Sequence, residues 1–396
     1  MCLIQYASMS LNLNNFVKLI LGSKYHNVFF IFVNNFCQMI NAIITGSGHF
    51  LPPNIIKNTH FLNHEFYDEK GERIDKPNEE IIQKFKEITE IEERRYADDD
   101  MVNSQMAAHA AQMALESAGV NKEDLDYVMV ATNYGDIRFR TNHADIMPSI
   151  SARVKNILQI KNNKCKPYDM TFGCPGWIEA LILASQLIKA GIAKKIVVIG
   201  SDMLSRAIDP YDRSAMIFAD GAGAVVLEAR EGEVEEGILN HVTIADNLDE
   251  MEFLRNGKSL NEEFKRDSFN ISMKGRKVYE YALQKVPAAI KELIDEKGLD
   301  ISDINKVLLH QANAKMDHAM ILRLFRLYGK KEIREGVDPM TVQKFGNSSV
   351  ATVPTMFDLI NRQQLGNHKF EKGDIIVFGS VGAGMSINAA LYKFPN

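Results

Sequence analysis

Cys174 is the residue whose surroundings best suit nucleophilic chemistry. Residues 166–170 are predicted to form a short strand, and residues 177–190 a nearly all-apolar helix that stops at Gly191. Pro175 suits a first helical turn, so Cys174 is expected at a tight strand-to-helix turn. Free N–H groups and the helix dipole favour a thiolate there, the form that attacks a carbonyl carbon. A small buried cysteine in a tight turn is the alternative that these local features leave open.

Two more polar residues, His310 and Asn347, are also predicted to follow strands. His310 comes directly after the apolar residues 307–309, and Asn347 stands between Gly346 and Ser348. Each has an ordinary explanation when taken alone, as a buried hydrogen-bonded histidine or as a turn asparagine. Because α/β proteins place ligands at the turns that follow strands, the three residues together predict one polar site.

The elements that must position this site occur twice along the chain. Apolar β-rich runs alternate with helical patterns, which predicts an α/β protein with a buried sheet. Residues 195–201 are echoed by residues 374–380, and each half also has a Gly-Ala-Gly turn that leads into a strand. A repeat this long predicts two similar α/β halves and not a solenoid of short units. Within the repeat, Cys174 and Asn347 occupy equivalent points.

This pattern divides the chain into three segments. Residues 39–230 form the N-terminal half with the candidate nucleophile, and residues 231–396 form the C-terminal half with the histidine and the asparagine. Residues 1–38 match neither half, and we interpret them as an extension, such as one left by upstream translation. Charged residues interrupt their apolar stretch, so it is unsuited to span a membrane, and no small-x-small cleavage site follows it. The folded protein is expected to begin at Met39.

Composition narrows the class of protein. Lys and Arg total 46 against 51 Asp and Glu, a formal charge of −5, which gives no global attraction to nucleic acid or to an anionic membrane. Four irregularly placed cysteines are too few for a disulfide framework or a zinc cluster. We therefore expect a cytoplasmic protein with no nucleic-acid partner, no membrane span and no bound metal.

The motifs around these residues resemble those of the β-ketoacyl-acyl-carrier-protein synthase III family, condensing enzymes of thiolase fold. That fold has two similar α/β halves with buried central helices, related by a pseudo-two-fold axis. The matching motifs follow the family's order: Thr171-Phe172-Gly173-Cys174-Pro175-Gly176, Gly200-Ser201-Asp202, Asp209-Pro210-Tyr211-Asp212-Arg213, Asp220-Gly221-Ala222-Gly223, His310-Gln311-Ala312-Asn313 and Gly346-Asn347-Ser348-Ser349.

The resemblance implies a catalytic triad of Cys174, His310 and Asn347 and a reaction in two stages. Cys174 would first take an acyl group from acyl-CoA or an acyl-carrier protein. Malonyl-acyl-carrier protein would then lose CO₂, and its enolate, held by His310 and Asn347, would attack the acyl-cysteine in a Claisen condensation. The backbone N–H groups of Cys174, Ala383 and Gly384 would hold the other oxyanion. No cofactor or metal is implied.

Substrate residues follow from the same resemblance. Arg213 matches a CoA contact, whereas residues 84–90 lack the Trp and the Arg-Thr-Gly with which CoA-using members bind the primer. Met147 matches the position from which the neighbouring subunit of a homodimer closes the acyl pocket, and a plain packing methionine is the alternative.

A basic helix face after His310 is the candidate docking surface for acyl-carrier protein. At 100° per residue, Lys315, Arg323 and Arg326 share one broad face, and a solvated face without a partner is the alternative. Two further functions stay open. One is a specialised condensing enzyme that joins two long acyl units, of the dialkylresorcinol or aryl-polyene type. The other is a non-catalytic partner subunit, which the intact triad disfavours.

Overall fold

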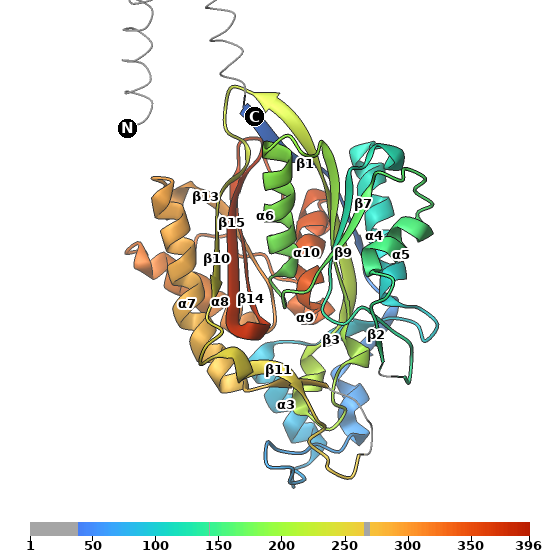
Figure 1. Ribbon diagram of the computed structural model, residues 1–396. Coiled ribbons are helices and arrows are strands. Elements are labelled where there is room, and N and C mark those ends of the chain that lie inside the picture. Colours follow the sequence, from blue (N-terminus) through green and yellow to red (C-terminus); the bar gives the residue numbers. More distant parts are fainter. Residues whose placement is uncertain (1–38, 142, 265–269) are drawn as a thin grey trace, which may run out of the picture.

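The computed structural model describes residues 39–141, 143–264 and 270–396, so the predictions made for residues 1–38 lie outside the described part of the chain. The layers follow the order helix, sheet, helix, sheet, helix (Figure 1). The central helices α6 (Gly176–Lys189) and α10 (Thr352–Asn361) lie between the two main sheets. They share one apolar core with strands of both sheets, which joins the two halves.

The N-terminal sheet has the strand order β1-β9-β8-β4-β7. Strands β4, β7 and β8 are parallel, and β9 is antiparallel to both β1 and β8. Because alternate side chains of a strand face opposite sides, Val128 and Val130 of β4 pack in the core with α4 and α5, whereas Tyr127 and Met129 pack in the core with α6. The elements are β1 (Met39–Phe50), β4 (Tyr127–Ala131), β7 (Lys166–Met170), β8 (Lys195–Met203), β9 (Asp220–Gly232), α4 (Asn103–Ala118) and α5 (Ile150–Ile157).

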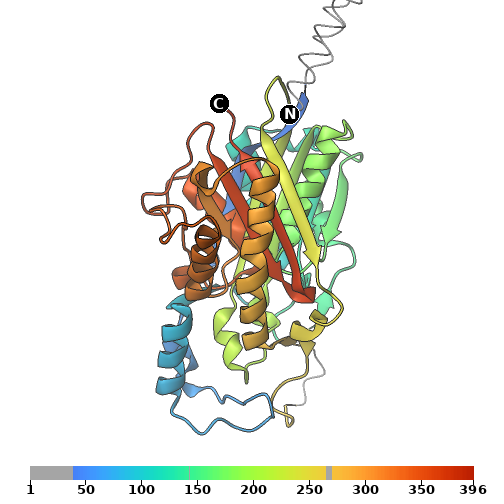
Figure 2. The same ribbon diagram turned by 90° about the vertical axis from the view of Figure 1, so that its left-hand side faces the viewer.

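The C-terminal sheet repeats this arrangement with the order β10-β15-β14-β13. Ile376 and Phe378 of β14 belong to the central core, and Val377 packs instead in the core with α7 and α8. Figure 2 looks onto the side of the sheet that these two helices cover. The elements are β10 (Gly237–Ala245), β13 (Ile304–Leu309), β14 (Ile375–Gly382), β15 (Ser386–Lys393), α7 (Gly275–Glu296) and α8 (Ala314–Leu327).

A smaller cap lies below the sheets in Figure 1. Its centre is Arg94, which is fully buried, donates to the carbonyl oxygen of Ile56 and to Asn58 Oδ1, and lies over the ring of Phe61. A Cβ at Gly346 would lie 2.7 Å from the Arg94 Cβ, so the cap packs against the residue next to Asn347. The cap contains β2 (Asn54–Lys57), η2 (Asn58–Asn63), α3 (Asn78–Thr89), β3 (Glu93–Tyr96), α9 (Val342–Phe345), β11 (Leu254–Gly257) and β12 (Asn270–Met273).

The predicted α/β architecture of two similar halves with buried central helices is confirmed. The strand expected at residues 166–170 is β7, and the helix expected at residues 177–190 is α6, which begins one residue earlier. The division at residues 230 and 231 stays a prediction.

Candidate active site

Cys174 lies in a turn whose backbone is in direct contact with the turn that follows β14. A Cβ at Gly382 would lie 2.5 Å from the backbone nitrogen of Cys174, so only glycine fits there. Gly173 has a φ of 69°, and a Cβ there would lie 2.9 Å from the backbone nitrogen of Ala383. The turns that the sequence repeat placed in different halves therefore meet at the candidate nucleophile.

His310 and Asn347 form a hydrogen-bonded pair. The strand β13 ends at Leu309, and the backbone N–H of His310 donates to the carbonyl oxygen of Gly379 on β14. Asn347 is fixed by backbone hydrogen bonds to Ile217 and Ala219, which precede β9. The side chains of His310 and Asn347 are buried, with 2.9 Å between His310 Nε2 and Asn347 Oδ1.

The surrounding hydrogen bonds define which atoms of this pair are donors. The backbone N–H of Ser349 donates to Asn347 Oδ1 at 2.7 Å, which fixes this atom as the amide oxygen. His310 Nε2 must then carry a proton to donate to the same oxygen. Burial lowers the pKa of His310, so the ring is neutral. The site thus holds a neutral imidazole with an Nε2–H and an amide whose Nδ2–H groups are turned away from Ser349.

Ser349 joins the pair to Cys174. It follows Asn347 by two residues, has a φ of 55°, and its hydroxyl donates to Cys174 Sγ at 3.3 Å. The predicted triad is therefore brought together as a continuous chain of contacts from Cys174 through Ser349 and Asn347 to His310. Sequence reasoning missed the role of Ser349, although the residue belongs to the motif that contains Asn347.

The protonation state of Cys174 differs from the thiolate that the sequence predicts. Burial raises the pKa of Cys174 to about 11, the Asp202 charge adds to the rise, and the Ser349 hydroxyl opposes it. The helix α6 begins at Gly176 after the cap residue Pro175, so Cys174 lies just outside the helix. Its resting form is the thiol, because desolvation outweighs the donors around it.

Asp202 is a buried carboxylate whose charge acts on Cys174. It belongs to the sequence motif Gly200-Ser201-Asp202, but the motif alone did not reveal its role. It accepts from the backbone N–H of Asn133 at 2.8 Å, from Asn133 Nδ2 at 2.7 Å and from the Thr132 hydroxyl at 3.2 Å. Burial raises the pKa of Asp202 to about 6, against these hydrogen bonds. Asn133 Nδ2 also donates to Ser349 Oγ, which links Asp202 to the triad.

The remaining predicted residues do not take part in the hydrogen bonds of the triad. Ala383 and Gly384 form the turn against Gly173, and Gly384 has a φ of 72°. Arg213 is exposed at the start of a short 3₁₀ helix, η5 (Arg213–Ile217). The Met147 residue is 87% exposed, so in this chain alone it does not cover the triad. The three basic residues of α8 are all exposed, as the docking prediction requires: Lys315, Arg323 and Arg326.

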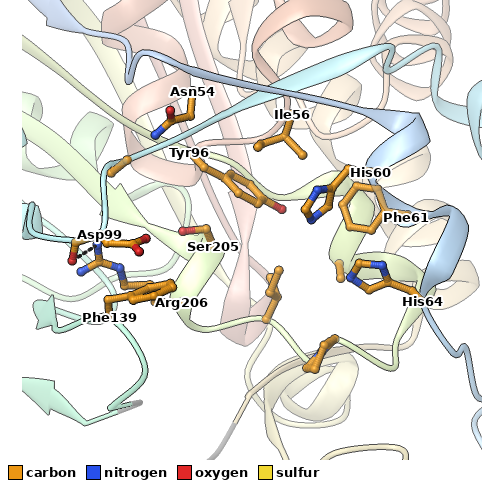
Figure 3. A pocket seen from close by; sticks show the side chains of 14 residues that line it. Asn54, Ile56, His60, Phe61, His64, Tyr96, Asp99, Phe139, Ser205 and Arg206 are labelled. Carbon is orange, nitrogen blue, oxygen red and sulfur yellow. Dashed lines mark hydrogen bonds between the residues drawn. The ribbon is translucent and has the colours of Figure 1, made fainter.

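A cavity of about 410 Å³ opens between the cap and the loops that follow β8 (Figure 3). No member of the triad lines it. Burial lowers the pKa of His60 and of His64, so both imidazoles on its wall are neutral. Other labelled residues around it include Tyr96, Ser205 and Arg206. The cavity is a neighbour of the candidate site and not part of it.

The part of the chain that the structure describes shows neither a metal-binding cluster nor a membrane-spanning helix. No group of three or more His, Cys, Asp or Glu side chains in that part of the chain is placed to hold a metal ion. Among the helices found there, none has the length and apolar character that a membrane crossing requires.

The chain was compared with known proteins. The sequence model of 3-oxoacyl-[acyl-carrier-protein] synthase III matches residues 168–247, and that of its C-terminal part matches residues 294–394. A β-ketoacyl-[acyl-carrier-protein] synthase III of Erythrobacter litoralis is 33% identical over 90% of this chain and 100% of its own length. One from Staphylococcus epidermidis is 32% identical over 90% and 99%. The crystal structure of 3-oxoacyl-[acyl-carrier-protein] synthase III from Aquifex aeolicus is 29% identical, with a TM-score of 0.72 over 89% of this chain and 100% of that one.

Proposed function

Because this chain belongs to the β-ketoacyl-acyl-carrier-protein synthase III family and is a condensing acyltransferase of thiolase fold, we propose that Cys174, His310 and Asn347 carry its reaction. The observation that carries the proposal is the chain of contacts from Cys174 through Ser349 and Asn347 to His310. It unites a nucleophile and two neutral donors from different halves of the molecule.

In the first half-reaction, Cys174 Sγ attacks the carbonyl carbon of an acyl thioester. A new carbon–sulfur bond forms, the old one breaks, and the thiol proton passes to the leaving thiolate. His310 Nε2 already carries a proton, so the imidazole is not set up as the base for this step. The N–H groups of Cys174 and of the Ala383 and Gly384 turn would stabilise the tetrahedral oxyanion.

In the second half-reaction, malonyl-acyl-carrier protein loses CO₂ and leaves an enolate. The His310 Nε2–H and the Asn347 Nδ2–H supply two donors for the enolate oxygen, and neither donor is charged. One such donor typically lowers a barrier by about 2.7–4 kcal/mol. The enolate carbon then attacks the acyl-cysteine, and Cys174 leaves as a thiolate that must regain a proton.

The partners and surroundings of the enzyme belong to the same proposal. The exposed Lys315, Arg323 and Arg326 of α8 fit an acidic acyl-carrier protein. The strand β7 is an exposed sheet edge, and Met147 is exposed on a neighbouring loop, as expected of a surface covered by a second copy of the chain. We therefore propose a cytoplasmic homodimer, without a metal or cofactor, in which Arg213 contacts CoA and Met147 the acyl pocket.

The test is mass spectrometry of the cysteines after separate incubation with acetyl-CoA, longer acyl-CoAs and acyl-carrier proteins. An acyl mass is expected on Cys174 and must disappear in Cys174→Ser, whose hydroxyl lacks a thiolate form. Cys165 is a free, buried cysteine that does not belong to the triad, so Cys165→Ala is the matched control and must keep the label. Acyl transfer by Cys174→Ser at the wild-type rate would contradict the proposal.

A second function, the joining of two long acyl units, is favoured by the altered primer motif near the end of α3. The same experiment separates the two functions, because they differ in the donor that labels Cys174. Labelling only by long acyl chains, followed by release of a product with two such chains, supports the second function.

A further inference from the structure

The turn between β14 and β15 has a backbone conformation that residues with side chains seldom adopt. Gly384 has a φ of 72° and Met385 a φ of 46°, so two successive residues lie in the left-handed region. Glycine adopts this conformation freely, whereas it is unfavourable for methionine. Such strain persists only where the surroundings hold it. Residues 382–385, which we call the oxyanion turn, must therefore be fastened by contacts with other parts of the chain.

One fastening is the hydroxyl of Tyr281, a buried residue of α7. Tyr281 Oη lies 3.0 Å from the carbonyl oxygen of Met385 and 2.9 Å from Asp246 Oδ2. Because Lys285 Nζ pairs with the same carboxylate oxygen at 3.1 Å, the Tyr281 proton remains available to the Met385 carbonyl. The backbone N–H of Asp246 also donates to this carbonyl, at 3.4 Å. Tyr281 thus holds one end of the oxyanion turn against α7.

A second fastening is the side chain of Asn247, in the loop that follows β10. Its Nδ2 donates to the carbonyl oxygen of Gly384 at 2.8 Å. A Cβ at Gly384 would lie 3.0 Å from the same nitrogen, so this loop packs directly against the oxyanion turn. The carbonyl oxygens of both left-handed residues are therefore bound by side chains that come from elsewhere in the sequence.

The conformation of the oxyanion turn affects its N–H groups. Gly382, the last residue of β14, is paired with Ser386, the first residue of β15, so both ends of the turn are fixed. A change of φ at Met385 must then be compensated at the residues before it, and each planar peptide unit turns its N–H as it rotates. The loop of the nucleophile lies next to these groups, since a Cβ at Gly173 would be 2.9 Å from the backbone nitrogen of Ala383.

We propose that Tyr281 and Asn247 are positioning residues for the oxyanion turn: their hydrogen bonds keep the N–H groups of Ala383 and Gly384 directed at the oxyanion of the acyl-transfer step. The inference rests on the proposed function, because it takes these N–H groups as donors to that oxyanion. Tyr281 and Asn247 act through the turn and not on the substrate.

The two half-reactions should depend differently on the oxyanion turn. Acylation of Cys174 passes through a tetrahedral oxyanion that this turn stabilises. Decarboxylation of malonyl-acyl-carrier protein instead builds its negative charge on the enolate, whose donors are His310 and Asn347. A displaced turn therefore slows acylation and leaves decarboxylation unchanged, whereas a general loss of structure slows both steps.

The experiment measures acylation of Cys174 by an acyl thioester and, without that thioester, CO₂ release from malonyl-acyl-carrier protein. Tyr281→Phe removes only a hydroxyl and should slow acylation about tenfold, with less than about a twofold change in CO₂ release. Asn247→Ala should slow acylation by about threefold, because the hydrogen bond that it removes is exposed to water.

Tyr328→Phe is the matched control. The Tyr328 hydroxyl also donates to a residue of α7, Asp295, at 2.8 Å, but its partners do not include the oxyanion turn. Both half-reactions must keep their wild-type rates in this variant. Equal losses of acylation and CO₂ release in Tyr281→Phe would overturn the inference, and so would unchanged acylation.

Hydrogen exchange of the peptide that contains residues 382–386 gives a readout that does not depend on activity. Exchange should accelerate in Tyr281→Phe and in Asn247→Ala, and it should stay at the wild-type rate in Tyr328→Phe. Wild-type exchange in all three variants would overturn the inference and leave the proposed function standing. A wild-type chain that takes no acyl group on Cys174 from any donor would overturn the proposed function, and exchange would then decide alone whether the two residues hold the turn.

Discussion

Asp202 of β8 and Asp317 of α8 are both fully buried carboxyl groups, and their surroundings differ sharply. Asp202 lies on the nucleophile side and accepts three hydrogen bonds from Asn133 and Thr132. Asp317 lies on the buried side of α8, the helix that follows His310, and neither of its carboxyl oxygens has a hydrogen-bond partner. Burial raises the pKa of Asp202 to about 6 and that of Asp317 to about 8. Hydrogen bonds to the charged form account for the lower value.

The difference shows that burial alone does not decide what a carboxyl group does in a site. At neutral pH, Asp202 is charged and fixes the loop that carries Asn133, and its charge helps to keep Cys174 a thiol. Asp317 keeps its proton and is neutral, because burial raises its pKa to about 8. At neutral pH Asp202 is thus charged, whereas Asp317 gains its charge only as the pH rises.

Removal of the donors should have the largest effect and should separate the two half-reactions. His310→Ala and Asn347→Ala each remove one enolate donor, so CO₂ release should fall about 100- to 1,000-fold, whereas acylation of Cys174 should change much less. The measurement compares CO₂ release with acyl-cysteine formation in each variant. Equal losses in both steps would place these residues in folding or in thiol activation.

Replacement of the charged Asp202 carboxyl should affect the stability of the protein more than its reaction rate. Asp202→Leu leaves the Asn133 backbone N–H, the Asn133 amide and the Thr132 hydroxyl without a buried acceptor, so we expect a loss of about 3 kcal/mol in the free energy of unfolding. Urea denaturation measures it. Asp202→Asn keeps the shape and can still accept, and should lose less. A Leu variant as stable as the wild type would show that these donors find other acceptors.

Replacement of the neutral Asp317 carboxyl should raise the free energy of unfolding, whereas replacement of Asp202 should lower it. The pKa of Asp317 is higher in the folded chain, about 8, than the usual value of about 3.9 in an unfolded one, so the folded state holds the extra proton between these values. Wild-type stability therefore falls with pH across this window, by at most about 1.4 kcal/mol per pH unit. Asp317→Leu should be more stable, by on the order of 1 kcal/mol at pH 5 and by more at pH 8.

Unfolding curves of the two chains at pH 5 and pH 8 measure this difference. A gap between the two chains that stays constant with pH would mean that Asp317 titrates at the same pH in the folded and unfolded states.

The smallest effect is expected at the exposed basic residues of α8. Charge reversal at Lys315 and Arg326 should raise the KM for malonyl-acyl-carrier protein several-fold and flatten its salt dependence, because steering charges are lost. Self-acylation from an acyl-CoA should change little. Charge reversal at Lys369, an exposed lysine outside α8, is a suitable control. An unchanged KM at low salt would mean that the carrier docks elsewhere.

The sequence predicted the parts of the site that follow from local pattern. The repeat placed Cys174 and Asn347 at equivalent turns, and the strand before His310 was visible as an apolar run. Ser349 and Asn133 could not be found in this way, because their roles depend on contacts between residues far apart in the chain. The expected Cys174 thiolate is replaced by a thiol for the same reason, since local pattern shows the helix end but not the burial around it.

The contact between the two turns also bears on how the protein is made. The N-terminal sheet is complete once β9 has left the ribosome, since β1 pairs with β9, whereas Ser349 and Gly382 are synthesised much later. At about 5–20 residues per second, residues 233–396 take about 10–30 s to synthesise. Throughout that interval the nascent chain has its reactive sulfur in place but lacks the segments that cover it. The nascent chain is therefore the form in which Cys174 is most open to oxidants and alkylating agents.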